Sequence, residues 1–275
     1  MMKFDVVEVF KYPTLDKEWV RKLVMITAPL AVVYLISSLI RFSSNILDVL
    51  SEFSDTADDF TYLLIYMGLI GVALLFSLAS LPLMLYISGY TLEATRSVMA
   101  GNRDTLPEHV EIGHKMLDGL KLWLARLPYY IGLTLAWVIA LAIFFFGAVV
   151  SFTDGGSIPI GVVMMIFAGL LVLAMIAVSF VLTFFVMPTT TYQYLKYNSV
   201  TAAWDLKKVY RISKLNWKNF GLSELITYVA SIITGIVSFV LTFCLIGWIA
   251  QAAGFVWLGL VRARLLGQAF AEAEE

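Results

Sequence analysis

The sequence has few charged residues. Asp, Glu, Lys and Arg make up 14% of its 275 residues, whereas hydrophobic residues make up 60%. Soluble globular domains carry about 25% charged residues, so this chain has too few to cover a soluble enzyme of its size. The mean hydropathy is +0.87. The composition therefore predicts a polytopic integral membrane protein of the cell membrane.

Cysteine and excess charge of one sign are also missing, which excludes two further classes of protein. Cys244 is the only cysteine, so the chain cannot be a secreted disulfide scaffold. The net charge is -1 and the pI is about 6.1, whereas nucleic-acid-binding domains are usually basic. We expect no nucleic-acid partner.

Catalytic and metal-binding motifs are absent as well. The sequence contains no Walker-type glycine loop, no nucleophile elbow and no paired cysteines. The two histidines, His109 and His114, are five positions apart, which places them about 140° apart around a helix. They cannot ligate one metal from one helix face as an i,i+4 pair could. We expect no metal site, no cofactor and no enzymatic activity.

Long apolar runs are what the sequence has instead. A transmembrane helix needs about 20 largely apolar residues, and four clear runs meet this requirement. Residues 225–261 would span roughly 55 Å as a single helix, which is too long for one crossing, so we divide this region into two spans. The six predicted spans are 23–40, 60–88, 127–151, 160–187, 220–243 and 247–266. The expected fold is all-α, with six transmembrane helices in three hairpins, and residues 1–275 form a single membrane domain.

The basic residues predict the orientation of these spans. Lys and Arg accumulate in cytoplasmic loops. With six spans and both termini in the cytoplasm, all of the 19 basic residues except Arg41 fall on the cytoplasmic side. We therefore expect an N-in, C-in topology.

Each of the three long cytoplasmic segments combines an amphipathic stretch with a tryptophan and precedes a hairpin of two spans. This shared plan indicates a degenerate threefold repeat and predicts interfacial helices at 3–20, 108–125 and 200–218. In the third segment, basic residues recur at helical spacing and form a candidate site for anionic lipid headgroups. They are Lys207, Lys208, Arg211, Lys214 and Lys218. The alternative is that these residues act only as topology signals.

The fifth span carries a polar stripe at steps of three and four residues. Its members are Glu224, Thr227, Ser231, Thr234, Ser238 and Thr242. Small hydroxyl residues allow helices to approach closely and to bond across their interface, so close packing is one interpretation. The other is a polar pathway with Glu224 at its cytoplasmic mouth, because ionisable residues within a membrane often mark function.

Several short motifs resemble a known family. They are Gly89-Tyr90, the run from Arg96 to Gly101, Leu106-Pro107-Glu108, and the run from Asp118 to Lys121. These segments are similar to the domain of unknown function 4013 family of prokaryotic, mainly archaeal, membrane proteins. The resemblance implies a polytopic membrane fold and an archaeal source, and it transfers no activity and no functional residue.

Three functions follow from these observations. The favoured hypothesis is a non-catalytic protein that associates with lipid or organises a membrane assembly. Its partners would be membrane lipids and other membrane-protein subunits. The alternative is a transporter or channel for a small solute, using the polar face of the fifth span. An intramembrane enzyme is the least favoured, because no catalytic cluster is found.

Overall fold

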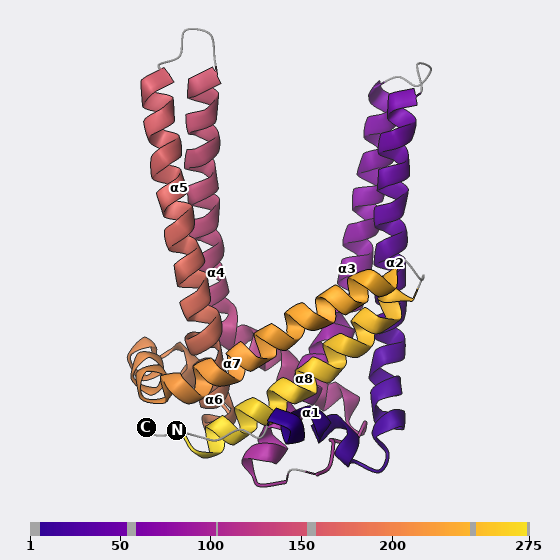
Figure 1. The fold of residues 1–275 in the computed structure, drawn as a ribbon, viewed down its shortest axis with the longest axis vertical. Coiled ribbons are helices and arrows are strands. Elements are labelled where there is room, and N and C mark those ends of the chain that lie inside the picture. The colour runs from indigo at the N-terminus through magenta and orange to yellow at the C-terminus, as the bar shows by residue number, and fades with distance from the viewer. Residues whose placement is uncertain (1–5, 54–58, 103, 153–157, 243–245, 274–275) are drawn as a thin grey trace. The chain divides into compact units, whose positions relative to one another are not determined.

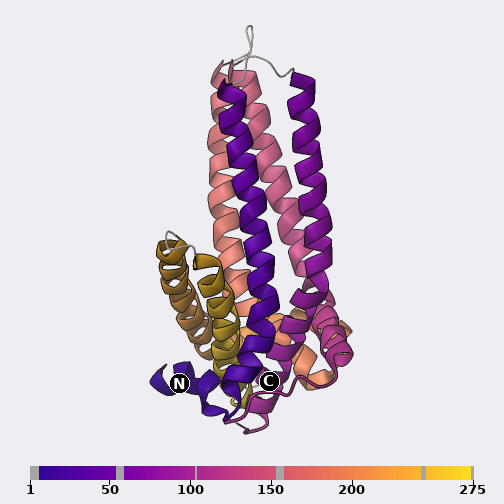
Figure 2. The same ribbon diagram turned by 90° about the vertical axis from the view of Figure 1, so that its right-hand side faces the viewer.

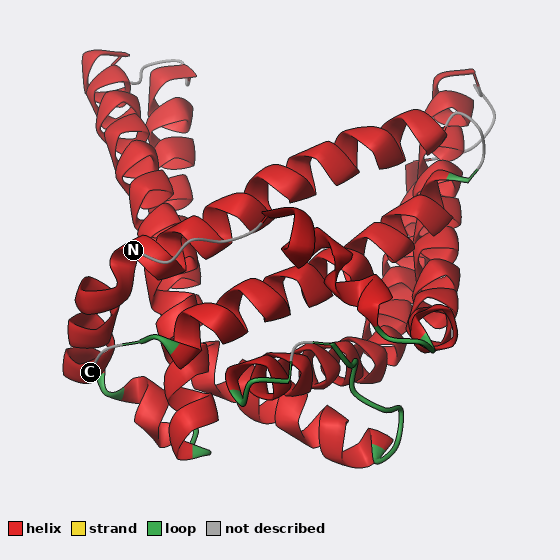
Figure 3. Cartoon of the chain, turned by 60° about the horizontal axis from the view of Figure 1, so that its bottom comes forward, coloured by secondary structure: helices red, strands yellow, loops and turns green. Residues whose placement is uncertain are grey.

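The computed structural model describes residues 6–53, 59–102, 104–152, 158–242 and 246–273, and within these ranges the chain is helical with no β-strand. Figure 3 shows the helices joined by short loops. The elements shown in Figure 1 are α1 (Val6–Leu15), α2 (Trp19–Phe53), α3 (Asp59–Met99), α4 (Ile112–Phe152), α5 (Ile158–Val181), the π-helical turn η1 (Leu182–Val186), α6 (Met187–Tyr197), the 3₁₀ helix η2 (Thr201–Trp204), α7 (Leu206–Thr242) and α8 (Gly247–Ala271). The all-α prediction is confirmed.

Six helical segments of the described chain are long and apolar enough to cross a membrane, which confirms the prediction of six spans. They are Trp19–Ile40, Met67–Met99, Ile112–Val150, Gly161–Tyr197, Leu206–Thr242 and Gly247–Ala271. Large apolar side chains on these segments are exposed, for example Val163 and Phe167 on α5. Exposed apolar helix surface of this extent is typical of a multi-pass membrane protein.

The segments expected to lie in the membrane interface differ in their structure. Range 3–20 contains α1, which is separate from the span that follows it. In ranges 108–125 and 200–218, by contrast, the helix that begins at Ile112 or Leu206 continues directly into the next span. No proline interrupts α7 between its amphipathic part and its apolar part. The helix therefore continues, because each residue that extends it adds one backbone hydrogen bond.

The chain divides into two compact units. Unit 1 contains Lys121–Glu224, and unit 2 contains Met2–Leu120 and Leu225–Ala271. In unit 2, α8 packs against α1, α2 and α3, and Figure 2 shows α8 beside α2. The core of unit 2 includes Tyr12, Leu30, Tyr90 and Leu260, each at most 1% exposed.

Two glycines of unit 2 allow the end of α3 and the start of α4 to touch through their backbones. A Cβ atom on Gly89 would lie 1.8 Å from the carbonyl oxygen of Lys115, and one on Gly119 would lie 2.0 Å from that of Leu85. Only glycine fits these two positions, because every other amino acid has a Cβ atom and Cβ atoms do not approach a backbone oxygen so closely. This contact positions the polar side chains that follow on both helices.

In unit 1, α4 and α5 lie side by side (Figure 1). Trp137 Nε1 of α4 donates to Ser179 Oγ of α5 at 3.4 Å. After η1, α6 is almost entirely buried, and Arg126 of α4 donates from Nη2 to Thr191 Oγ1 of α6 at 2.7 Å. The α7 helix meets this bundle at η1, where Gly221 of α7 lies against the Phe185 ring.

Candidate functional site

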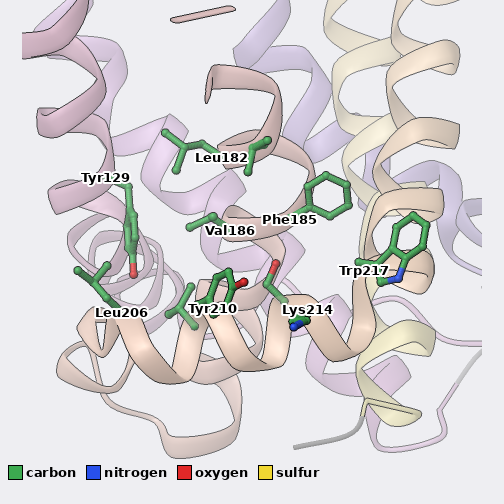
Figure 4. Close-up of a pocket in the computed structure, with 11 residues that line it drawn as sticks. Tyr129, Leu182, Phe185, Val186, Leu206, Tyr210, Lys214 and Trp217 are labelled. Atoms are coloured by element: carbon green, nitrogen blue, oxygen red, sulfur yellow. The ribbon is translucent and has the colours of Figure 1, made fainter. Parts of the chain in front are cut away.

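Unit 1 contains a groove of about 480 Å³, within the size range of small-molecule binding pockets. Its walls come from α4, from the end of α5 with η1, and from α7. The lining residues are Tyr129, Val181, Leu182, Phe185, Val186, Leu206, Val209, Tyr210, Ser213, Lys214 and Trp217. Figure 4 shows Leu182, Phe185 and Val186 opposite Tyr210, Lys214 and Trp217, with Tyr129 beside Leu206. The groove is therefore mainly apolar and aromatic.

The π-helical turn η1 forms one wall of the groove. A π turn inserts one extra residue into a helix and is frequently found at functional sites. The carbonyl oxygen of Phe185 accepts a hydrogen bond from Thr189 Oγ1 at 2.7 Å. The Phe185 ring lies over Gly221 of α7, where a Cβ atom would come within 2.9 Å of Cε1. The missing side chain at residue 221 therefore makes room for the ring.

The first half of α7 presents three successive faces. At 3.6 residues per turn, Val209, Ile212 and Phe220 fall on one side, and all three are buried. The next side faces the groove through residues such as Tyr210 and Trp217. The third side we call the basic face; it consists of Lys207, Arg211, Lys214 and Lys218, all exposed. Lys214 lies at the border between the basic face and the groove, and its side chain is part of the groove lining.

The five basic residues predicted as a headgroup site are not equivalent in the structure. Lys208 lies off the basic face, with its Nζ 3.8 Å from the centre of the Tyr197 ring. The Nζ of Lys218 is 5.6 Å from the centre of the Trp217 ring. In the described part of the chain, Lys207 and Lys214 make neither an ion pair nor a hydrogen bond through their side chains. Their ammonium groups are therefore available to an anion.

The aromatic wall of the groove was not predicted. Tyr129 and Phe185 lie in uniformly apolar spans, where the sequence offers no signal that distinguishes one aromatic residue from another. Tyr210 and Trp217 are seven positions apart beside the basic residues, so two turns of an amphipathic helix already place them on one face. That spacing is the signal that could have identified them.

The residues of the predicted polar stripe of α7 differ in their burial. Glu224 and Ser238 are buried, whereas Ser231 is exposed. Ser231 Oγ donates to the carbonyl oxygen of Thr227 at 2.7 Å, and Thr242 Oγ1 donates to that of Ser238 at 2.9 Å. Such bonds satisfy a hydroxyl within its own helix. None of the six residues lines the groove.

An ion-pair network centred on the buried Lys22 lies in unit 2, near the start of α2. Lys22 Nζ contacts Asp16 Oδ2 at 2.9 Å and Glu108 Oε1 at 2.6 Å, and it also donates to the carbonyl oxygen of Leu106 at 3.0 Å. Burial alone raises the pKa of Asp16, but hydrogen bonds from Lys22 and from the backbone amides of Glu18 and Leu106 outweigh it and hold this pKa below its usual value. The network joins the segment before α2 to the loop before α4.

The two histidines do not converge. His109 Nε2 donates to the carbonyl oxygen of Lys22 at 2.8 Å, which leaves Nδ1 of the neutral ring to accept from the Tyr86 hydroxyl. Burial lowers the pKa of His109, as does the nearby charge of Lys115, although the bond to Lys22 opposes this shift. His114 Nδ1 lies 4.0 Å from Asp118 instead. Among the described residues, no group of three or more His, Cys, Asp or Glu side chains could hold a metal.

Comparison with known proteins identifies the family but no activity. The family model described as "Protein of unknown function (DUF4013)" matches residues 72–247, a range that includes the whole groove. Neither the curated proteins nor the solved structures gave a match. Because the family model covers more than half of the chain, the protein belongs to the DUF4013 family.

Proposed function

We propose that this protein is a non-catalytic lipid-binding membrane protein that holds an acyl chain in the groove of unit 1 and an anionic headgroup at the basic face of α7. The observation that carries the proposal is the position of Lys214, which belongs both to the basic face and to the lining of the apolar groove. One bound molecule with an apolar tail and an anionic head matches both surfaces.

The binding free energy of such a molecule comes mainly from its headgroup. Each methylene group removed from water contributes about 0.8 kcal/mol, but in a bilayer the tail is already in an apolar medium, so the groove gives little net gain for the tail itself. Basic residues near an anionic headgroup contribute about 1 kcal/mol each. We therefore assign affinity to the basic face and selection of the bound molecule's shape to the groove.

The proposal includes the orientation expected from the sequence. With both termini in the cytoplasm, the basic face lies at the inner leaflet, where anionic lipids accumulate. In that orientation the amphipathic half of α7 follows the interface, with Trp217 at headgroup depth as is usual for interfacial tryptophans. Partners are then the membrane lipids, and a lipid held in this way can also seal a contact with another membrane-protein subunit.

Lipid retention by the purified full-length chain tests the headgroup half of the proposal. The protein is reconstituted in nanodiscs containing phosphatidylglycerol and phosphatidylcholine, extracted in mild detergent, and its bound lipids are counted by native mass spectrometry. Lys207→Gln/Lys214→Gln/Lys218→Gln should lose the bound phosphatidylglycerol. The control Lys11→Gln/Lys17→Gln/Arg21→Gln removes the same charge from exposed positions and should retain it. Equal loss in both variants would reduce the basic face to a topology signal.

A second pair of variants tests the groove. Ser213→Trp places a large side chain in the groove lining, whereas Leu215→Trp adds the same ring at an exposed position on the same helix. Ser213→Trp should release the bound lipid while the basic face stays intact, and Leu215→Trp should not. Retention in both variants would show that the groove is not the site of the acyl chain.

A further inference from the structure

Unit 2 contains a polar cleft of about 420 Å³ that is separate from the groove of unit 1. It lies between the end of α3, the start of α4 and the loop that joins them. The lining residues are Gly89, Glu93, Arg96, Glu108, Val110, Glu111, His114, Lys115 and Asp118. None of these residues lines the groove of unit 1.

The floor of the cleft is fixed by close packing. The approach of α3 and α4 at Gly89 brings the backbone of Lys115 against α3. The charged side chains of Lys115 and Asp118 are 6% and 9% exposed, so both charges are held where water has little access. Buried charges need partners, and the surrounding residues provide them.

Most charges of the cleft are paired. Lys115 Nζ donates to Glu93 Oε2 and lies 5.6 Å from the centre of the Tyr90 ring. Glu108 is paired with Lys22 at 2.6 Å. The charges of Lys115, Glu93 and Glu108 are therefore each paired with an opposite charge.

Two opposite charges of the cleft, on Arg96 and Glu111, are exposed enough to contact a ligand. The Arg96 guanidinium approaches Asp118 at 3.6 Å, which is longer than a hydrogen bond, and within the described residues its side chain makes no hydrogen bond. Its side chain is 42% exposed and faces Asp118 through Nη1, so a ligand can reach the other N–H donors of the guanidinium group. The Glu111 carboxylate is exposed and has no ion pair among the described residues.

Glu111 is also held in an unusual backbone conformation. Its φ is 59°, in the left-handed region that residues other than glycine rarely adopt, and its carbonyl oxygen accepts the bond from the Lys115 amide at 3.1 Å. The loop thus begins α4 with a carboxylate at the cleft rim, and Arg96 reaches the same cleft from α3.

We propose that this cleft binds a small zwitterion, with its oxyanion on Arg96 and its ammonium group on Glu111. Guanidinium groups recognise phosphate and carboxylate through two parallel N–H donors, and an ammonium group provides the three donors that a carboxylate accepts. A phosphoethanolamine group has both charges on a short linker. It can reach the cleft as a free solute or as a lipid headgroup.

Calorimetric titration of the purified full-length chain, in a non-ionic detergent, tests this proposal. The probes are O-phosphoethanolamine, inorganic phosphate, which has only the oxyanion, and ethylamine, which has only the ammonium group. O-phosphoethanolamine should bind at least about tenfold more tightly than either half, since each charge-assisted contact contributes to affinity. The proposal would be overturned if inorganic phosphate or ethylamine bound as tightly as O-phosphoethanolamine. It would also be overturned if none of the three probes bound.

Variants locate the two contacts. Arg96→Gln and Glu111→Gln should each weaken binding of O-phosphoethanolamine about tenfold or more. The matched controls Arg21→Gln and Glu18→Gln alter an exposed ion pair elsewhere in unit 2 and should leave binding unchanged. If Arg96→Gln fails to fold, Glu111→Gln decides the question, because the Glu111 side chain has no ion pair to lose among the residues that the structure describes. Unchanged binding in Glu111→Gln contradicts the proposal.

A competition arm distinguishes the two sources of the ligand. The chain is placed in nanodiscs of phosphatidylethanolamine or of phosphatidylcholine, whose trimethylammonium group cannot donate to Glu111. The protein is the same in both nanodiscs, so that only the lipid headgroup differs. Weaker O-phosphoethanolamine binding in the phosphatidylethanolamine nanodiscs supports the site with a lipid headgroup as its ligand. Equal binding in both supports it with a free solute.

Discussion

Lys22 in unit 2 and Lys214 in unit 1 are both lysines at the end of an apolar segment, but the structure surrounds them differently. The Lys22 side chain is 4% exposed and lies between Asp16 and Glu108. Lys214 is exposed and lines an apolar groove without an ion pair in the described chain. A buried charge must be paired to be tolerated, so Lys22 stabilises the fold. Lys214 is available for binding.

The cleft of unit 2 and the groove of unit 1 show the same contrast between paired and available charges. The cleft of unit 2 is polar and built on ion pairs, whereas the groove of unit 1 is apolar with cations at its edge. Removing a buried, paired charge from unit 2 should therefore reduce stability. Removing one from the basic face of α7 should reduce binding and leave stability unchanged.

Lys22→Met is expected to have the largest effect on stability. It leaves the buried carboxylate of Asp16 and the carbonyl oxygen of Leu106 without their shared donor, and breaking a buried pair from one side costs about 3–5 kcal/mol. Thermal unfolding in detergent should show a large fall in Tm. The control Lys17→Met, at an exposed position, should change Tm little. Equal Tm values for the two variants would contradict the structural role of Lys22.

Gly89→Ala should follow in size. The added methyl group would overlap the carbonyl oxygen of Lys115, and overpacking of this kind costs about 1–3 kcal/mol. Gly71→Ala is the matched control on the same helix, because nothing lies within 4 Å of its added Cβ. Since alanine favours a helix over glycine by about 1 kcal/mol, Gly71→Ala should raise Tm slightly. A similar response of the two variants would show that α3 and α4 do not touch at residue 89.

His109 should give unit 2 a moderate pH dependence. Its pKa is lowered in the folded chain, so on acidification the unfolded chain takes up the proton first. Stability is therefore full above the ordinary histidine pKa of about 6.5 and falls as the pH drops below it. Tm measured from pH 7.5 to pH 5 should decline for the natural chain. His109→Asn should have a lower Tm at pH 7.5 but a flatter profile, and a decline of equal slope in both would exclude His109 as the group responsible.

Thr234→Val should have the smallest effect. Thr234 meets Gly254 through its Cγ2 methyl group, which valine retains, and hydroxyl bonds between membrane helices contribute about 1 kcal/mol or less. Tm should change little. A large loss of stability would show that the Thr234 hydroxyl holds the α7–α8 hairpin together.

The sequence predicted the number of spans because apolar length is a local property that the bilayer thickness imposes. It also placed Lys207 and Lys214 on one helix face, because 3.6-residue periodicity is local as well. The groove depends on Phe185 in a π turn and on its fit over Gly221, which are contacts between residues distant in sequence. The pairing of Lys22 with Glu108 is equally non-local, so charge counting treated Lys22 as one more topology signal.

Photochemical mapping of a bound lipid shows directly whether its acyl chain lies in the groove of unit 1. Phosphatidylglycerol with a diazirine on one acyl chain is incorporated into nanodiscs with the full-length chain, activated by light, and the labelled residues are identified by mass spectrometry. We expect the label to concentrate at residues 182–186 and 206–217, and we expect Ser213→Trp to remove it. Label spread over the exposed apolar face of α5, at Phe167, Leu170 and Leu173, and unchanged in Ser213→Trp, would contradict this expectation.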